Sequence, residues 1–286
     1  MASIEFINRG VNKMHYIKYL NSSDNTKLYT KINDAPEAKA NIIIVHGLAE
    51  HLDRYDILTA YLNENNFNVI RYDQRGHGRS GGAQTYYSNM YEIVEDLTAI
   101  IEYVKTTFEG KVYLIGHSMG GYTVTLFETI YPGAVDGVVT SGALTRYNNK
   151  LFGNPDPSFS SDTYIKNELG DGVCSDAEVI RKYEIDQLNA KQISMGLIRT
   201  LLDGITYLKN NAERFTNNIL ILHGKEDGLV SYHDSLQLYQ EIESEHKSIH
   251  IYDRLQHEIF NESSYNLSIF KEIVDWLDNE IRISKI

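Results

Sequence analysis

The sequence is poor in cysteine, in basic residues and in long apolar runs. It has 286 residues and one cysteine, Cys174, so no disulfide can form within the chain and nothing points to an oxidising compartment. Its 27 Lys and Arg stand against 39 Asp and Glu, a formal net charge of −12, which disfavours nucleic acid and anionic membranes as partners. No apolar stretch approaches the roughly 18 residues of a membrane-spanning helix.

Signals for targeting, metals and nucleotides are also missing. Residues 1–6 contain no basic head before an apolar run, so we expect no secretory signal and a cytoplasmic protein. His and acidic residues do not fall at the H-E-x-x-H spacing of a zinc site. The glycine-rich residues 76–82 do not match G-x-x-x-x-G-K-[ST] and are interpreted as a tight loop. We therefore expect no metal and no cofactor.

Apolar residues make up 42% of the chain and charged residues 23%, ordinary values for a globular protein with a normal core. Alternation of strand and helix patterns predicts an α/β fold with a mostly parallel sheet, in which ligands bind beyond the carboxyl ends of the strands. Strands are expected at residues 15–20, 27–32, 41–45, 67–72, 111–115, 135–140, 219–222 and 248–252. Helices are expected at 53–64, 91–108, 119–130, 232–242 and 265–281.

The alternation stops after Ser141. Residues 143–213 contain a Pro- and Gly-bearing loop and two predicted helices, at 176–188 and 194–209, with no evident strand. We interpret this segment as a helical cap inserted over the strand ends. The core domain would then consist of residues 1–142 and 214–286.

The segment from Gly116 to Gly120 carries the strongest chemical signal. It reads G-x-S-x-G between a buried strand and a helix, the arrangement that exposes a serine at a sharp turn, and it makes Ser118 the candidate nucleophile. A Cβ at either glycine would collide with the crowded strand and helix. The competing interpretation is that Ser118 only caps the helix.

A serine nucleophile needs a base and an acid that orients the base. His257 follows the last predicted strand and is the expected base, with His246 and His250 as rivals in or before that strand. Asp227 follows the preceding strand and is the expected acid, with Glu226 as its rival. The chain order Ser, Asp, His is the order of α/β-hydrolases.

Two backbone N–H groups should stabilise the oxyanion of the tetrahedral intermediate. One is the amide of Met119, directly after the nucleophile. The other is expected from the loop His46-Gly47-Leu48-Ala49, at the amide of Leu48. His46 is expected to brace this loop by hydrogen bonding rather than to act as a base. His117, beside the nucleophile, is expected to be structural, as is Cys174.

Several motifs together resemble the monoacylglycerol lipase and lysophospholipase branch of the α/β-hydrolases, which includes serine aminopeptidases of the S33 type. The motifs are residues 46–51, Arg54-Tyr55, residues 73–80 and 116–121, His223-Gly224-x-x-Asp227 and His257-Glu258. The resemblance implies an eight-stranded, mostly parallel sheet with a helical cap, a glycerol- or headgroup-bearing acyl ester as substrate, and no cofactor.

The predicted cap departs from lipid-acting members because long stretches of it are polar, at residues 146–150, 154–161 and 168–171. Its apolar residues could pack on the core or form a surface for transient lipid contact: Leu151, Phe152, Phe159, Ile165, Ile198, Leu201 and Leu202. The alternatives are therefore an esterase for small soluble esters or thioesters, an aminopeptidase using cap acids such as Glu168, Asp171 or Glu184, and a non-catalytic binding protein. The oligomeric state is open.

Overall fold

A computed structural model describes residues 15–168 and 172–283. Residues 1–6 and Asp171, considered above, lie outside the described residues. Within these ranges, no helix combines the length and apolar character needed to span a bilayer.

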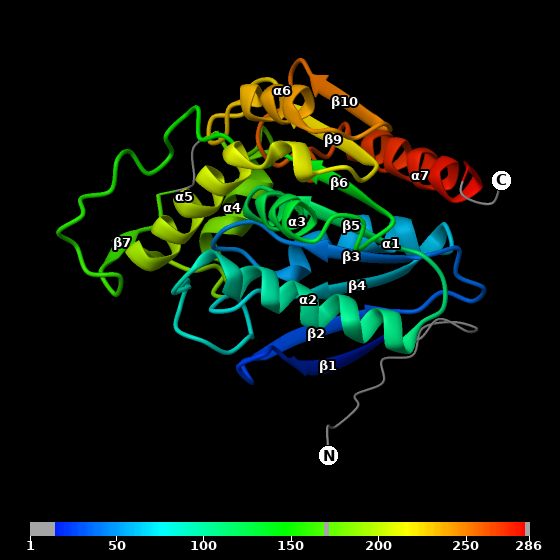
Figure 1. The fold of residues 1–286 in the computed structure, drawn as a ribbon, viewed down its shortest axis with the longest axis horizontal. Helices are drawn as coiled ribbons and strands as arrows, with labels where there is room; N and C mark the ends of the chain where they lie inside the picture. Colours follow the sequence, from blue (N-terminus) through cyan, green and yellow to red (C-terminus); the bar gives the residue numbers. More distant parts are fainter. Residues whose placement is uncertain (1–14, 169–171, 284–286) are drawn as a thin grey trace.

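An eight-stranded sheet forms the centre of the molecule (Figure 1). Its strand order is β1-β2-β4-β3-β5-β6-β9-β10; β1 and β2 pair antiparallel, β2 pairs antiparallel with β4, and all later neighbours are parallel. The strands are β1 (His15–Asn21), β2 (Lys27–Asn33), β3 (Asn41–Val45), β4 (Asn68–Tyr72), β5 (Val112–His117), β6 (Gly137–Ser141), β9 (Ile219–Gly224) and β10 (Lys247–Tyr252). The predicted eight-stranded, mostly parallel sheet is confirmed.

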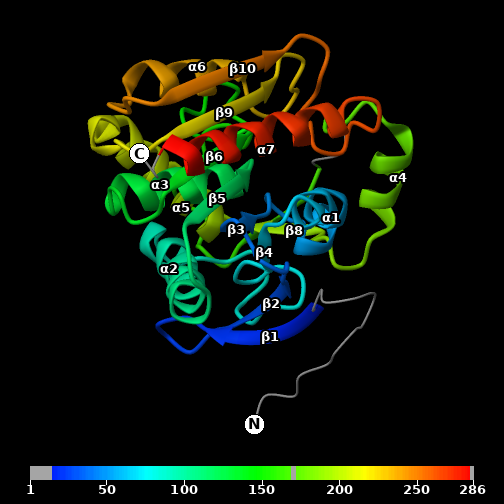
Figure 2. The same ribbon diagram turned by 90° about the vertical axis from the view of Figure 1, so that its right-hand side faces the viewer.

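Helices cover both faces of the sheet, as Figure 2 shows for α1 and α7 on one side and α2 and α3 on the other. The core helices are α1 (Asp56–Glu64), α2 (Met90–Thr107), α3 (Met119–Ile130), α6 (Tyr232–Glu241) and α7 (Asn266–Ile283), with a short 3₁₀ turn η1 (Leu52–Tyr55) before α1. Strands β3 to β6 are buried along their whole length, and their centres are accordingly rich in Val, Ile and Leu.

Most of the described residues between 143 and 213 lie toward one end of the molecule, on the left in Figure 1. They form β7 (Tyr164–Lys166), α4 (Ala177–Ile185), β8 (Gln192–Ser194), α5 (Met195–Asn210) and the short turn η2 (Ala212–Arg214). The expectation that this segment has no strand is wrong, because β7 and β8 pair as a small antiparallel ribbon. Each has three residues, too short for a periodic pattern to be visible.

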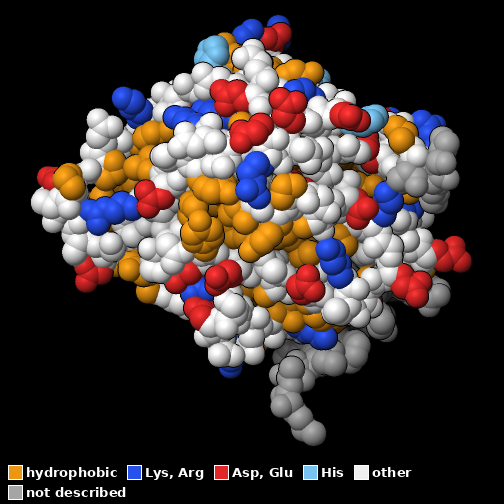
Figure 3. Space-filling view, viewed as in Figure 1, with side chains coloured by type: hydrophobic (Ala, Val, Ile, Leu, Met, Phe, Trp, Pro, Cys, Tyr) orange, Lys and Arg blue, Asp and Glu red, His pale blue; other side chains and the backbone are white. Residues whose placement is uncertain are grey.

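Helix α5 packs deeply. Six of its apolar side chains are buried in the same cluster as α2 and α3: Met195, Leu197, Ile198, Leu201, Ile205 and Leu208. Of the other apolar residues predicted in this segment, Leu151, Phe152, Ile165 and Leu202 are half-buried and Phe159 is exposed. Most of them therefore pack inward. On the face seen in Figure 3, a separate apolar patch lies over α3, ringed by charged side chains.

Candidate active site

Ser118 occupies the sharp turn between β5 and α3. Its backbone has φ 54° and ψ −115°, a left-handed conformation that residues other than glycine rarely adopt. The surrounding structure holds this strained turn, since the N–H of Ser118 donates to the carbonyl of Ser141 at 2.8 Å. The Ser118 side chain makes no capping hydrogen bond to α3, so the helix-cap interpretation has no support.

Two glycines allow this turn to pack against its neighbours. A Cβ added at Gly116 would lie 2.3 Å from the carbonyl oxygen of Gly120. A Cβ added at Gly120 would lie 2.0 Å from the carbonyl oxygen of Val45. These separations are far below any contact that carbon and oxygen tolerate, so the collision expected from the sequence is present in the structure and involves backbone that cannot move aside.

His257 and Asp227 meet at the carboxyl ends of β9 and β10. The Nδ1 atom of His257 lies 2.6 Å from Oδ2 of Asp227, and both side chains are almost completely buried. Burial by itself would lower the pKa of His257, but the charge and the hydrogen bond of Asp227 outweigh it and raise that pKa. Gly142, at φ 55°, leaves the space beneath this pair, since a Cβ there would lie 3.1 Å from Nδ1 of His257.

The rivals for these roles lie elsewhere. Glu226, His246 and His250 are exposed, and His250 faces Glu272 on α7. His117 is buried beside His257, with ring centroids 4.6 Å apart, and its Nδ1 lies 3.1 Å from Oγ of Ser141. Burial lowers the pKa of His117 to about 3, with His257 adding to the effect, so the ring stays neutral and acts as a packed spacer.

The loop after β3 is fixed from several sides. His46 accepts the N–H of Gln74 at Nε2, at 2.9 Å, so Nδ1 carries the proton and donates to the carbonyl of Gly47 at 2.7 Å. Burial lowers the pKa of His46 to about 4. The ring is therefore neutral and braces the loop, as expected. Leu48 and Met119 line the same cavity as Ser118, within which their amides were predicted to bind an oxyanion.

The Arg54 guanidinium joins this loop to the segment that carries His257, a connection that the sequence did not predict. Its Nε donates to Oε2 of Glu50 at 2.7 Å and its Nη2 donates to Glu258. Glu50 in turn accepts the N–H of Gly47 and the hydroxyl of Tyr55. Arg54-Tyr55 and His257-Glu258 were among the family-like motifs, but only the fold reveals that they touch.

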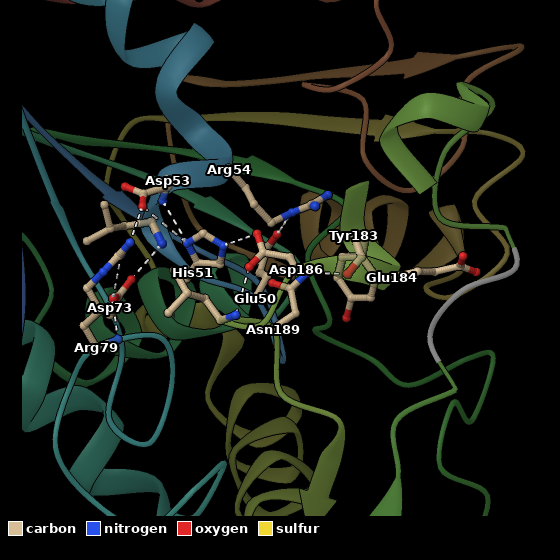
Figure 4. Close-up of polar contacts among 12 residues, drawn as sticks. Glu50, His51, Asp53, Arg54, Asp73, Arg79, Tyr183, Glu184, Asp186 and Asn189 are labelled. Atoms are coloured by element: carbon tan, nitrogen blue, oxygen red, sulfur yellow. Dashed lines mark hydrogen bonds and ion pairs between the residues drawn. The ribbon is translucent and has the colours of Figure 1, made fainter. Parts of the chain in front are cut away.

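The end of α4 closes over this network (Figure 4). The ring of Tyr183 lies beneath the Arg54 guanidinium, 4.9 Å from its carbon, while Glu184 points away from the cluster. His51 reaches the same segment, with Nε2 2.9 Å from Oδ2 of Asp186. A polar seam thus connects residues 50–54 with the end of α4.

A cavity of about 460 Å³, including its mouth, is lined by Ser118 and His257. Its apolar lining consists of Leu48, Met119, Leu144, Leu151, Val173, Leu201 and Leu229. The charged and phenolic lining residues are Glu50, Tyr183 and Glu258, and all three contact Arg54. The structure therefore brings every predicted site residue to one place. Their catalytic roles stay predictions.

A serine at a strained strand-to-helix turn, at the carboxyl edge of an eight-stranded, mostly parallel sheet, is the arrangement of an α/β-hydrolase. More specifically, the chain belongs to the family described as "Serine aminopeptidase, S33" (Hydrolase_4), which matches residues 36–264. This confirms the predicted fold class and family.

Among known proteins, the chain is similar to the monoacylglycerol lipase of Mycolicibacterium smegmatis, with 27% identity over 82% of this chain and 87% of that protein. It is similar to the monoglyceride lipase of Homo sapiens, with 26% identity over 84% and 82%. The crystal structure of Paleococcus ferrophilus monoacylglycerol lipase superposes with a TM-score of 0.77 and 28% identity, covering 88% of this chain and 99% of that one. With these relatives, the chain is a carboxylic ester hydrolase, as predicted.

Proposed function

We propose that this protein hydrolyses the ester bond of a monoacylglycerol-like substrate through an acyl-enzyme on Ser118. His257 is the general base, Asp227 orients it, and the amides of Leu48 and Met119 stabilise the oxyanion. The observation that carries the proposal is the His257–Asp227 pair, at 2.6 Å, at the cavity that Ser118 also lines.

The hydrogen bonding of His257 supports the direction of proton transfer. A carboxylate only accepts hydrogen bonds, so Nδ1 of His257, facing Asp227, carries the proton. Nε2 is then free to take the Ser118 proton as the hydroxyl attacks the acyl carbon, and to return it to the leaving alcohol. Water activated by the same nitrogen releases the acid. The chemistry needs no metal and no cofactor.

The composition of the cavity supports an acyl ester with a polar alcohol portion. Leucines and Val173 offer an apolar surface for an acyl chain, whereas Glu50, Tyr183 and Glu258 offer hydrogen-bonding atoms for alcohol hydroxyls. Arg54 compensates the two carboxylates, which weakens the case for a negative subsite that would bind the amine of a peptide. Glu168 and Glu184, considered for that role, are exposed.

We also propose that residues 143–213 act as a cap over residues 1–142 and 214–286. In support, five cavity residues come from this segment: Leu144, Leu151, Val173, Tyr183 and Leu201. A cytoplasmic location, and transient lipid contact through the cap, stay predictions.

The test compares wild type with Ser118→Ala on p-nitrophenyl esters from acetate to palmitate, on a monoacylglycerol, on a thioester and on an aminoacyl p-nitroanilide. We expect monoacylglycerol turnover, and a loss of about 10³-fold or more in Ser118→Ala without loss of fold. Near-normal activity of Ser118→Ala would falsify the nucleophile assignment. A preference for short soluble esters with no monoacylglycerol turnover would replace the substrate proposal, and anilide turnover alone would favour a peptidase.

A further inference from the structure

A second imidazole contacts the carboxylate of Asp227. His223, near the end of β9, is completely buried, and its Nε2 lies 3.0 Å from Oδ2 of Asp227 and 3.0 Å from the carbonyl oxygen of Val230. Its Nδ1 lies 2.7 Å from the hydroxyl of Ser235 on α6. One ring therefore connects β9, the loop that follows it and the next helix.

The partners of His223 fix its tautomer. A carboxylate and a carbonyl oxygen both accept, so Nε2 carries the proton and donates to both. Nδ1 then accepts from the Ser235 hydroxyl. Among the hydrogen-bond partners of this ring within the described chain, Asp227 alone carries a charge. A neutral His223 satisfies all these contacts.

The two oxygens of Asp227 have different roles. Oδ1 accepts the backbone amides of Leu229 and Val230, each at 2.8 Å, which fixes the carboxylate plane. Oδ2 is shared, accepting from His257 at 2.6 Å and from His223 at 3.0 Å. Each extra donor on a carboxylate oxygen stabilises its charged form and weakens its pull on a neighbouring proton.

We propose that His223 is a positioning residue that sets the basicity of His257 by donating to the Asp227 oxygen that His257 also uses. This inference rests on the proposed function, because it requires His257 to be the general base. Removing the His223 donor leaves Oδ2 more basic. The imidazolium form of His257 is then held more strongly, so its pKa rises.

Other charged groups near His257 also affect its pKa, but substitution of His223 leaves them unchanged. Asp227, Glu258 and Glu50 raise the pKa of His257, and the neighbouring His117 is neutral. None of these groups hydrogen-bonds to His223 apart from Asp227. A change in the titration of His257 on substitution of His223 therefore reports on the shared oxygen.

Two substitutions of His223 distinguish the hydrogen bond at Nε2 from the hydrogen bond at Nδ1. In His223→Gln the amide nitrogen can occupy the place of Nε2 and keep the donor to Asp227. In His223→Asn the shorter amide can replace Nδ1 toward Ser235 but cannot reach Asp227. His223→Met fills a similar volume with no donor, and Ser235→Ala removes only the bond on the far side.

The measurement is kcat/KM against pH on the preferred p-nitrophenyl ester, whose acidic limb reports the base of the free enzyme. We expect the limb of His223→Asn and His223→Met to move up by about half to one pH unit. In His223→Gln and Ser235→Ala the limb should stay at its wild-type position. Thermal unfolding of each variant gives the structural contribution separately.

Equal limbs in all folded variants would overturn the inference, as would a failure of both donorless variants to fold, which would make His223 a purely structural residue. The proposed function fails in a different way, through an inactive wild type or an active Ser118→Ala. The two failures are therefore distinguishable.

Discussion

Gly204 of α5 lies against the phenolic oxygen of Tyr122 in α3. A Cβ added at Gly204 would lie 1.8 Å from that oxygen and 2.6 Å from the ring carbon that carries it. The Tyr122 hydroxyl also donates to the carbonyl of Thr200 at 3.2 Å. Because α3 begins at the residue after Ser118, this contact joins α5 to the helix of the proposed nucleophile.

Gly204→Ala is expected to destabilise the protein by about 1–3 kcal/mol, since Tyr122 is buried and α5 must move to admit the methyl group. Urea denaturation measures the change. Tyr122→Phe removes the oxygen that the methyl group meets first, so the double variant should lose less than the sum of the two single losses. If the two stability losses add fully, the methyl group at position 204 does not meet the Tyr122 hydroxyl.

Arg54→Met should destabilise the protein by about 3–5 kcal/mol, because it leaves Glu50 and Glu258 buried without their shared cation. Arg54→Lys keeps the charge but cannot donate in the planar, forked geometry that reaches both carboxylates, so an intermediate loss is expected. Arg181→Lys, in an exposed pair with Glu178, is the control and should change stability by less than about 1 kcal/mol. An unfolding curve for Arg54→Met matching that of the control would contradict the bridging role.

Ester hydrolysis should decline on acidification through a pKa above the ordinary 6.5 of histidine. The proposed base works only when neutral, and the Asp227 charge, with smaller contributions from Glu258 and Glu50, favours its protonated form over the effect of burial. Glu258→Gln removes one of these charges and should move the acidic limb of kcat/KM to lower pH. A limb that moves up, or stays at its wild-type pH, would show that Glu258 is not felt at His257.

Asp234 holds the beginning of the proposed cap. Its carboxylate accepts the backbone N–H groups of four consecutive residues, at 2.7–3.2 Å: Thr145, Arg146, Tyr147 and Asn148. Asp234→Ala leaves these amides without a partner and should speed proteolytic cleavage within residues 145–163 several-fold, with a stability loss of about 1–3 kcal/mol. If cleavage there is no faster than in a His233→Ala control, contacts other than those of Asp234 hold residues 145–148 in place.

The elements that bury a continuous apolar surface could be predicted closely. The structure reproduces the expected bounds of β3 (Asn41–Val45) and α3 (Met119–Ile130), since β3 is almost entirely β-branched and apolar and α3 begins directly after the G-x-S turn. The positions of Ser118, Asp227 and His257 could be predicted because each lies at or shortly after the carboxyl end of a buried or parallel strand: β5, β9 and β10.

The missed features depend on contacts between distant segments. β7 and β8 pair with each other across the segment between them. Each strand is too short to show a periodic pattern of apolar residues. Arg54 and Glu258 are 204 residues apart in the sequence, so no local signal connects them. His223 belongs to one of the family-like motifs, yet its contact with Ser235 depends on how α6 packs against β9.

The burial of α5 limits how freely this enzyme can be recombined with its relatives. A chimera that exchanges all of residues 143–213 replaces part of the main core, including the surface that meets Tyr122, and must repack it. An exchange that ends before β8 keeps α5 in place and replaces four residues that line the cavity: Leu144, Leu151, Val173 and Tyr183. Substrate preference is therefore most open to transplantation in the first two-thirds of the segment, and the remainder behaves as fixed framework.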